Sequence, residues 1–303
     1  MTRLLLALLP MLLPLPLLAE ERDRNFTLQH DGVERQYRVH LPPGYGDRGA
    51  PLPVVIYLHG GGGGTVSAYL DGVHKSADQH GFLLAIPAAT RIDKKPMSSR
   101  WNGGRWKGGE CCGTADDIGF LAKMLDDLAR RFRVDEQRVY AAGISNGGLM
   151  THRVACELSE RVAAVATVAP AAVPQDCAPV RPIPVMNIHG TKDPCNPFDG
   201  SDPKGFCARA GYKRMSPAEV VETWRKLDGC GETAVPGFRR GKASCTRYPD
   251  CRQGAEVAFC RVDGMGHAWP GGAQYFPAGL IGPVSEDISM NEIWTFFREH
   301  PLP

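Results

Sequence analysis

A serine between glycines, an aspartate and a histidine follow one another along this chain, and together these residue types can cleave a carbonyl compound. Ser145 lies in the Gly-x-Ser-x-Gly segment 143–147. An apolar run over 138–142 precedes this segment, and a helix-compatible stretch over 149–158 follows it. This layout is typical of a serine nucleophile held on a sharp turn between a strand and a helix. By itself the five-residue pattern is weak in a chain with 35 glycines.

Two further residues stand in the order that such a nucleophile requires. Asp193 comes directly after the apolar run 185–188, and His267 lies in a glycine-rich loop after the run 257–262. We expect Ser145 to attack, His267 to move the proton and Asp193 to orient the imidazole. Asp193 could instead cap an Asp-Pro turn, and His267 could be an ordinary packed histidine. The order of the three residues favours the catalytic interpretation.

A glycine-rich loop supplies the remaining chemistry. His59 is followed by five glycines directly after the apolar run 54–58. We expect the backbone N–H groups of Gly61 and Asn146 to form an oxyanion hole, and His59 to position the loop. A flexible loop and a phosphate-binding loop are the alternatives, and the Lys-Ser/Thr end of a P-loop is missing.

Two tryptophans lie in loops at the same expected edge. Trp269 follows His267 by two residues, and Trp101 begins the segment Trp-Asn-Gly-Gly. Each indole could bind substrate by stacking on an aromatic or sugar ring. Structural packing explains both residues almost equally well, so both interpretations stay open.

Near-continuous apolar runs alternate with amphipathic ones, which predicts a doubly wound α/β fold with a mostly parallel sheet. Helices are expected over 116–131, from the capping box at Ser216 to Gly229, and from the capping box at Ser289. Long loops over 96–115 and 195–215 interrupt the alternation. The expected strands cover 37–41, 54–58, 82–87, 139–142, 163–168, 185–188 and 257–262.

The N-terminus has the pattern of an export signal. One arginine precedes a leucine-rich run that ends at Ala19, and charged residues follow. We expect a signal peptide over 1–19 and a single catalytic domain over 20–303. A membrane anchor is the alternative, but prolines break the short apolar run. The net charge of +2, without basic runs, argues against nucleic acid as a partner.

Ten cysteines in an exported chain predict disulfides. Metal binding is the alternative, but no two cysteines have the C-x-x-C spacing of common zinc sites. We expect neither a metal nor another cofactor, and the sequence leaves the oligomeric state open. The expected pairs are Cys156–Cys177, Cys195–Cys207 and two bridges among Cys230, Cys245, Cys251 and Cys260, with Cys111 and Cys112 either forming a vicinal pair or pairing elsewhere.

A set of motifs across the mature chain resembles one known family. By these motifs the chain is similar to the secreted polyhydroxybutyrate depolymerase / feruloyl esterase family, carbohydrate-esterase-type enzymes with the α/β-hydrolase fold. The motifs are Leu58-His59-Gly60-Gly61, Trp101-Asn102-Gly103-Gly104, Cys111-Cys112-Gly113, Asp116-Asp117-Ile118-Gly119-Phe120, Gly143-Ile144-Ser145-Asn146-Gly147-Gly148, His189-Gly190-Thr191-Lys192-Asp193-Pro194 and Gly266-His267-Ala268-Trp269-Pro270-Gly271-Gly272.

The resemblance implies a serine esterase with Ser145, Asp193 and His267 as its triad and Gly61 and Asn146 as its oxyanion donors. Two features depart from the family: the glycine run lacks a cysteine that many relatives carry there, and the segment 195–207 resembles an insertion. Only 36 residues follow His267, which favours feruloyl or related plant-polymer esters over solid polyhydroxybutyrate, the alternative substrate. A peptidase and a non-catalytic binding protein are less favoured alternatives.

Overall fold

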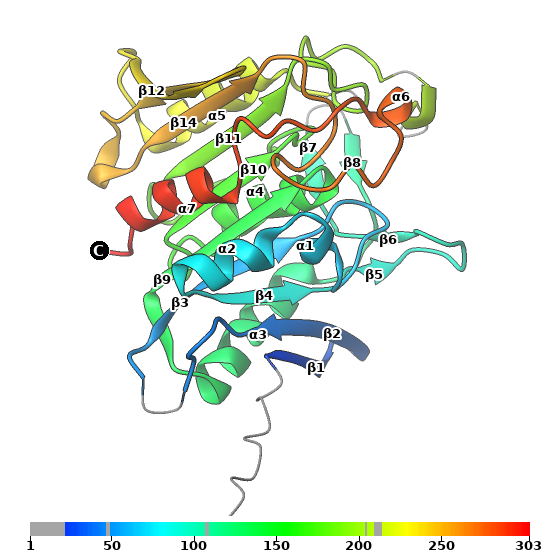
Figure 1. Ribbon diagram of the computed structural model, residues 1–303, viewed down its shortest axis with the longest axis vertical. Coiled ribbons are helices and arrows are strands. Elements are labelled where there is room, and N and C mark those ends of the chain that lie inside the picture. The colour runs from blue at the N-terminus through cyan, green and yellow to red at the C-terminus, as the bar shows by residue number, and fades with distance from the viewer. Residues whose placement is uncertain (1–21, 47–48, 107–108, 204, 209–213) are drawn as a thin grey trace, which may run out of the picture.

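One large sheet organises the molecule. The computed structural model describes residues 22–46, 49–106, 109–203, 205–208 and 214–303, so the expected signal peptide lies outside the described residues. The strands of the sheet are β1 (Asp23–His30), β2 (Val33–His40), β3 (Leu52–Leu58), β4 (Leu83–Pro87), β9 (Val134–Ile144), β10 (Ala164–Val168), β11 (Val185–Gly190), β12 (Val235–Arg240), β13 (Ala243–Tyr248) and β14 (Val257–Val262). Among the described residues the sheet has ten strands, in the order β1-β2-β4-β3-β9-β10-β11-β14-β13-β12 (Figure 1).

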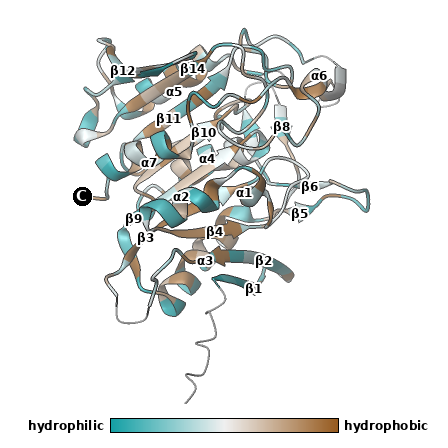
Figure 2. Ribbon diagram, in the orientation of Figure 1, coloured by the Kyte–Doolittle hydropathy of each residue, from teal (hydrophilic) through white to brown (hydrophobic). Residues whose placement is uncertain are grey.

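The middle of the sheet is parallel, as the apolar runs predict. Strands β4, β3, β9, β10, β11 and β14 pair in parallel, and Figure 2 shows most of this region as hydrophobic. The strand expected over 37–41 is present as β2, but it is not part of the parallel region. It runs antiparallel to both β1 and β4. Its residues alternate between exposed and buried positions, which is the pattern of an antiparallel strand with one solvated face.

Helices cover both faces, which confirms the doubly wound architecture. Side chains of α2 (Val73–His80) and α7 (Met290–Glu299) join one apolar cluster, and Figure 1 shows these two helices on the viewer's side of the sheet. Side chains of α3 (Asp117–Arg131), α4 (Asn146–Glu157) and α5 (Pro217–Asp228) join the cluster on the other face. None of the described helices is long and apolar enough to cross a membrane.

The helix ends follow the predicted signals. Both capping boxes are formed, by Ser216 with Glu219 and by Ser289 with Glu292. Gly229 ends α5 in the left-handed conformation that glycine adopts without steric cost. The short helices α1 (Ser67–Leu70) and α6 (Ala278–Ile281) have no such signals and were not expected.

The long loop expected over 96–115 is built from two small hairpins. The first pairs β5 (Thr90–Arg91) with β6 (Ser99–Arg100), and the second pairs β7 (Gly104–Trp106) with β8 (Gly109–Cys111). The disulfides confirm the expected pairs Cys156–Cys177 and Cys195–Cys207. The two bridges expected among the last four cysteines are Cys230–Cys251 and Cys245–Cys260, and Cys111–Cys112, which the sequence left open, is a vicinal pair.

Candidate active site

Ser145 occupies a strained turn between β9 and α4. Its φ of 58° and ψ of −118° lie in a region that side chains rarely adopt. The turn is tight enough to require both flanking glycines. A Cβ on Gly143 would lie 2.5 Å from the Gly147 carbonyl oxygen, and a Cβ on Gly147 would lie 2.0 Å from the Leu58 carbonyl oxygen. The predicted strand–turn–helix layout is therefore confirmed, with Ser145 at the N-terminus of α4.

The loops that carry Asp193 and His267 lie against each other. They leave the carboxyl ends of β11 and β14, which are neighbouring parallel strands. The Lys192 N–H donates to the Met265 carbonyl at 2.9 Å. A Cβ on Gly190 would lie only 2.2 Å from that same carbonyl oxygen, so the close approach requires glycine. The result is a 2.8 Å hydrogen bond between His267 Nδ1 and Asp193 Oδ2.

Asp193 is a buried carboxylate with a full set of hydrogen bonds. Its Oδ1 accepts from the N–H groups of Cys195 at 2.7 Å and Asn196 at 2.8 Å, while Oδ2 accepts from His267. Burial alone would raise the pKa of Asp193, but the charge and hydrogen bond of His267 and the backbone donors hold this pKa below its ordinary value. Because a carboxylate only accepts, His267 carries its proton on Nδ1, which leaves Nε2 as the basic nitrogen.

The structure brings Asp193 and His267 into contact and places Ser145 at the same edge of the sheet. The strand order β9-β10-β11-β14 puts all three after the carboxyl ends of parallel strands. In open α/β sheets, active sites collect at this edge. The hydrogen bonds of the described residues do not include one between Ser145 Oγ and His267 Nε2. Such bonds are commonly long in a site without substrate.

The glycine-rich loop passes beside the serine. A Cβ on Gly60 would lie 3.7 Å from Ser145 Cβ. His59 is buried, and its Nε2 accepts the Ala89 N–H at 3.1 Å, so Nδ1 carries the proton and donates to the Gly60 carbonyl at 2.7 Å. Burial lowers the pKa of His59 to about 4 and keeps the ring neutral. Across a trans peptide the Gly61 N–H points opposite to the Gly60 carbonyl that His59 holds.

Both tryptophans are buried and packed against protein. The Trp101 indole donates from Nε1 to the His59 carbonyl at 3.0 Å. The Asn146 side chain holds the Trp101 backbone at both its N–H and its carbonyl. Trp269 meets the Tyr57 ring edge-on, with centroids 5.2 Å apart. These contacts support the packing interpretation, and a ring-stacking role of either indole stays a prediction.

Two buried residues near the site were not identified from the sequence as contributors. His189 Nε2 donates to the Asn196 carbonyl at 2.8 Å and lies 3.6 Å from Asp193 Oδ2. Burial lowers the pKa of His189, so its ring is neutral. The side chain of Asn196 donates to the Ala169 carbonyl at 2.7 Å, which ties the acid loop to the end of β10. The spacing of His189 four residues before Asp193 was the available signal.

A second buried carboxyl group lies beside the loop that follows His267. Asp71 is 4% exposed, and its Oδ2 accepts a short hydrogen bond from the Tyr57 hydroxyl. Its Oδ1 has no partner among the described residues, although a Cβ on Gly272 would lie 3.2 Å from it. Burial raises the pKa of Asp71 to about 7.

Asp193, Cys195 and His267 place metal-ligand atoms within 4.8 Å of one another. Cys195 is bonded to Cys207, and a disulfide sulfur is a poor metal ligand. Asp193 and His267 are already hydrogen-bonded to each other. The donor chemistry therefore favours an acid–base pair over a metal site.

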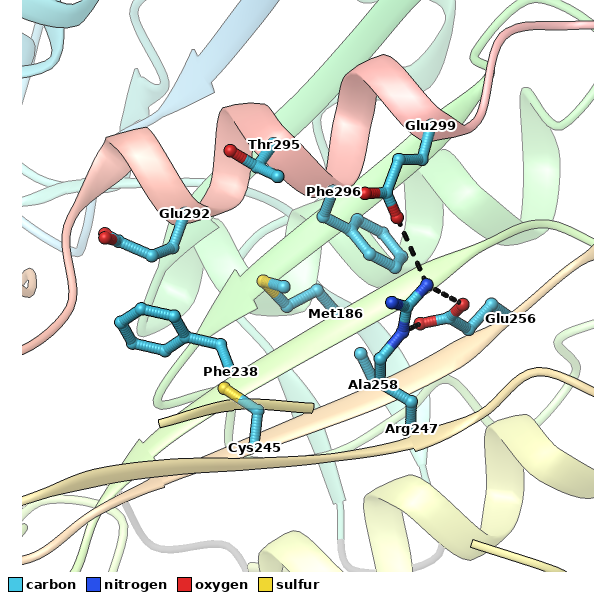
Figure 3. A pocket seen from close by; sticks show the side chains of 10 residues that line it. All are labelled: Met186, Phe238, Cys245, Arg247, Glu256, Ala258, Glu292, Thr295, Phe296 and Glu299. Atoms are coloured by element: carbon cyan, nitrogen blue, oxygen red, sulfur yellow. Dashed lines mark hydrogen bonds and ion pairs between the residues drawn. The ribbon is translucent and has the colours of Figure 1, made fainter. Parts of the chain in front are cut away.

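A pocket of about 230 Å³ lies away from these residues, between α7 and strands β12–β14 (Figure 3). Glu256, just before the amino end of β14, lines it, whereas His267 follows the carboxyl end. The charged side chains of its wall are paired: Arg247 contacts Glu256 and Glu299, and Glu292 contacts Arg240. With its polar groups already satisfied, this pocket offers no free group for a ligand, and we assign it no role.

Comparison with known proteins decides the family. The family model described as "Putative esterase" matches residues 30–225. A protein of Nocardia uniformis subsp. tsuyamanensis named "Putative esterase NocK" is 30% identical over 85% of this chain and 77% of its own length. The chain belongs to this esterase family. It is a carboxylic ester hydrolase.

Feruloyl esterase B of Piromyces equi is also 30% identical, over 77% of this chain but 42% of its own length. The expected resemblance to feruloyl esterases is thereby confirmed. Among solved structures, an acetyl xylan esterase from Aspergillus awamori covers 91% of this chain and 99% of its own, with a TM-score of 0.59 and 13% identity. A thermostable esterase covers 92% of this chain and 63% of its own, with a TM-score of 0.57 and 16% identity. These likenesses confirm the α/β-hydrolase fold of the esterase.

Proposed function

We propose that this esterase is exported and works through an acyl-enzyme, with Ser145 as nucleophile, His267 as general base and Asp193 as the group that orients the imidazole. The 2.8 Å bond between His267 Nδ1 and the ionised Asp193 carries the proposal. Ser145 Oγ attacks the ester carbonyl while His267 Nε2 accepts its proton. The same proton then passes to the leaving alcohol, and water repeats the sequence to release the acid.

The oxyanion of the tetrahedral intermediate is bound by the N–H groups of Gly61 and Asn146 in this proposal. The first N–H groups of a helix have no partner within it, and Asn146 is the first residue of α4. The Gly61 N–H has no acceptor among the described residues, and His59 fixes its peptide. Donors fixed before the reaction stabilise developing charge without reorganisation.

The proposed substrates are feruloyl, cinnamoyl or related plant-polymer esters. The names of several relatives support this class, including the feruloyl esterases of Piromyces equi and Emericella nidulans. Hydroxybutyrate esters are the second choice. The five disulfides support export from a reducing cytosol, together with the signal peptide expected over 1–19.

An ester panel on the purified protein tests the proposal. We expect Ser145→Ala to lower kcat on a p-nitrophenyl ester by about 10⁴-fold or more. Ser201→Ala, at an exposed serine, is the matched control and should keep wild-type turnover. Full activity of Ser145→Ala would contradict the proposed role of Ser145 as the nucleophile. If the wild-type enzyme degrades a poly(hydroxybutyrate) film but does not hydrolyse methyl ferulate, the order of the two proposed substrate classes is reversed.

A further inference from the structure

The guanidinium of Arg100 lies directly against the oxyanion loop. A Cβ on Gly61 would lie 2.9 Å from Arg100 Cζ and Nε and 3.1 Å from Nη1. One residue earlier, a Cβ on Gly60 would lie 3.7 Å from Ser145 Cβ. Through these contacts and one peptide unit, Arg100 Cζ is within about 14 Å of Ser145 Cβ. A positive charge therefore lies within about 14 Å of the nucleophile, a separation that a substrate can span.

Only one nitrogen of this guanidinium is occupied by protein. Nη1 donates to the carbonyl oxygens of Met97 at 2.9 Å and Ser99 at 2.8 Å, which holds the plane of the group. Within the described residues, Nε and Nη2 have no acceptor, and no carboxylate lies within 4 Å. Some half-buried arginines elsewhere in the chain have a carboxylate partner, as Arg153 has Glu157 and Arg225 has Glu222, whereas Arg181 bonds, among the described residues, only to backbone carbonyls.

The unoccupied side of Arg100 has the shape of a carboxylate receptor. The N–H groups of Nε and Nη2 point in parallel along one edge of the plane, and such an edge binds both oxygens of a carboxylate. The hairpin β5–β6 that carries Arg100 also bears the exposed cations Arg91, Lys94 and Lys95 against one acid, Asp93. Their combined field attracts anions toward this edge of the sheet.

We propose that the free edge of Arg100 binds a carboxylate of the substrate, so that the preferred esters carry a negative charge a few bonds from the scissile bond. This rests on the proposed function, because it assigns a specificity to the Ser145 site. The carboxylate can belong to the acyl part of the ester or to its alcohol part. A purely supporting role of Arg100, which would hold Gly61 in place, predicts the same loss for charged and neutral esters.

Two matched ester pairs separate these roles. For the acyl part, mono-p-nitrophenyl glutarate is compared with p-nitrophenyl pentanoate. For the alcohol part, 3-butanoyloxybutanoate is compared with its methyl ester. The measured quantity is the ratio of kcat/KM for the acid to kcat/KM for its neutral partner, in the wild type, Arg100→Gln, Arg100→Lys and the exposed-cation control Lys95→Gln.

We expect Arg100→Gln to lower this ratio about tenfold or more in one pair, and that pair identifies the side that carries the charge. Arg100→Lys should give a smaller loss, because an ammonium keeps the charge but not the two-donor edge. Lys95→Gln removes one exposed cation of the same hairpin but no donor of Arg100, so it should lower the ratio much less than Arg100→Gln does. Raising the salt concentration to about 1 M should lower kcat/KM for the carboxylate-bearing ester but not for its neutral partner.

An unchanged ratio in both pairs, or an equal fall for acids and neutral esters, would overturn the assignment of Arg100. Failure of the proposed function gives a different result. In that case Ser145→Ala would retain turnover of all four esters, whatever Arg100 does to their ratios.

Discussion

Two buried aspartates near the candidate active site, Asp193 and Asp71, differ in pKa although they are equally removed from water. Each is 4% exposed. Asp193 accepts three hydrogen bonds, from two backbone N–H groups and His267. Asp71 accepts one, from the Tyr57 hydroxyl, and one of its oxygens has no partner among the described residues.

The consequence is a divergence in pKa. Burial acts to raise the pKa of both carboxyl groups. For Asp193 the charge of His267 and the surrounding donors reverse this effect, so that its pKa falls below the ordinary value. For Asp71 nothing but Tyr57 opposes burial, and its pKa rises to about 7. Burial therefore does not determine the charge of a carboxyl group here; the number and kind of its donors do.

The largest effect is expected from replacing each aspartate by the neutral isostere. Asp193→Asn removes the charge that stabilises the imidazolium and allows the wrong tautomer of His267, so kcat should fall by about 10³- to 10⁴-fold. Asp71→Asn should keep kcat within about threefold, because Asp71 is already about half protonated at pH 7. Turnover of a p-nitrophenyl ester, with circular dichroism as a check on folding, measures both. A fall in kcat in Asp71→Asn as large as in Asp193→Asn would contradict the different roles assigned to the two aspartates.

The sequence predicted those features that depend on neighbours along the chain. Gly143 and Gly147 lie two residues on either side of Ser145, and both capping boxes lie within four residues. Asp193 and His267 were proposed because each follows a predicted strand, in the order after Ser145 that such a nucleophile requires. Strands β12 and β13 were not predicted, because their apolar residues are few and interrupted by polar ones.

What the sequence could not predict depends on partners far away in the chain. The partner of Asp71 is Tyr57, 14 residues earlier, and the guanidinium of Arg100 meets Gly61 across 39 positions. The support that His189 gives to Asp193 depends on a loop whose path no local pattern fixes. Burial and unpaired atoms, the features that give these residues their chemistry, exist only once the chain has folded.

A smaller effect is expected in the pH dependence of stability. The folded pKa of Asp71, about 7, lies above its ordinary value of 3.8. The folded state therefore binds more protons than the unfolded state between about pH 4 and 7, and the free energy of unfolding falls as the pH rises through this window. Asp71→Asn has no carboxyl group at this position, so its unfolding free energy does not fall for this reason as the pH rises. Relative to the wild type, the variant should gain a few kcal/mol between pH 4 and pH 8.

Urea unfolding at both pH values measures this difference. Asp228, whose pKa burial also raises to about 7, titrates in the wild type and the variant alike, so the comparison of the two proteins isolates Asp71. A constant difference between them at pH 4 and pH 8 would show that folding does not raise the pKa of Asp71.

Tyr57→Phe should act on the same carboxyl group by about 1–3 kcal/mol. It removes the single hydrogen bond that Asp71 accepts and leaves a buried acceptor without a donor. The loss of unfolding free energy should be larger at pH 8 than at pH 5, because a bond to an ionised carboxylate is stronger than one to a neutral group. An equal loss at both pH values would mean that Tyr57 serves only to fill space.

The smallest effect is expected at His189, which helps to set the loop that gives Asp193 its donors. Its Nε2–H holds the Asn196 carbonyl, and the Asn196 N–H in turn binds Asp193. His189→Gln places an amide donor where Nε2 was and should keep kcat close to the wild type. His189→Leu has no donor and should lower kcat about fivefold, or ~1 kcal/mol, with KM unchanged because the loss falls on the transition state. If both variants lose kcat equally, the bulk of the ring and not its N–H maintains the environment of Asp193.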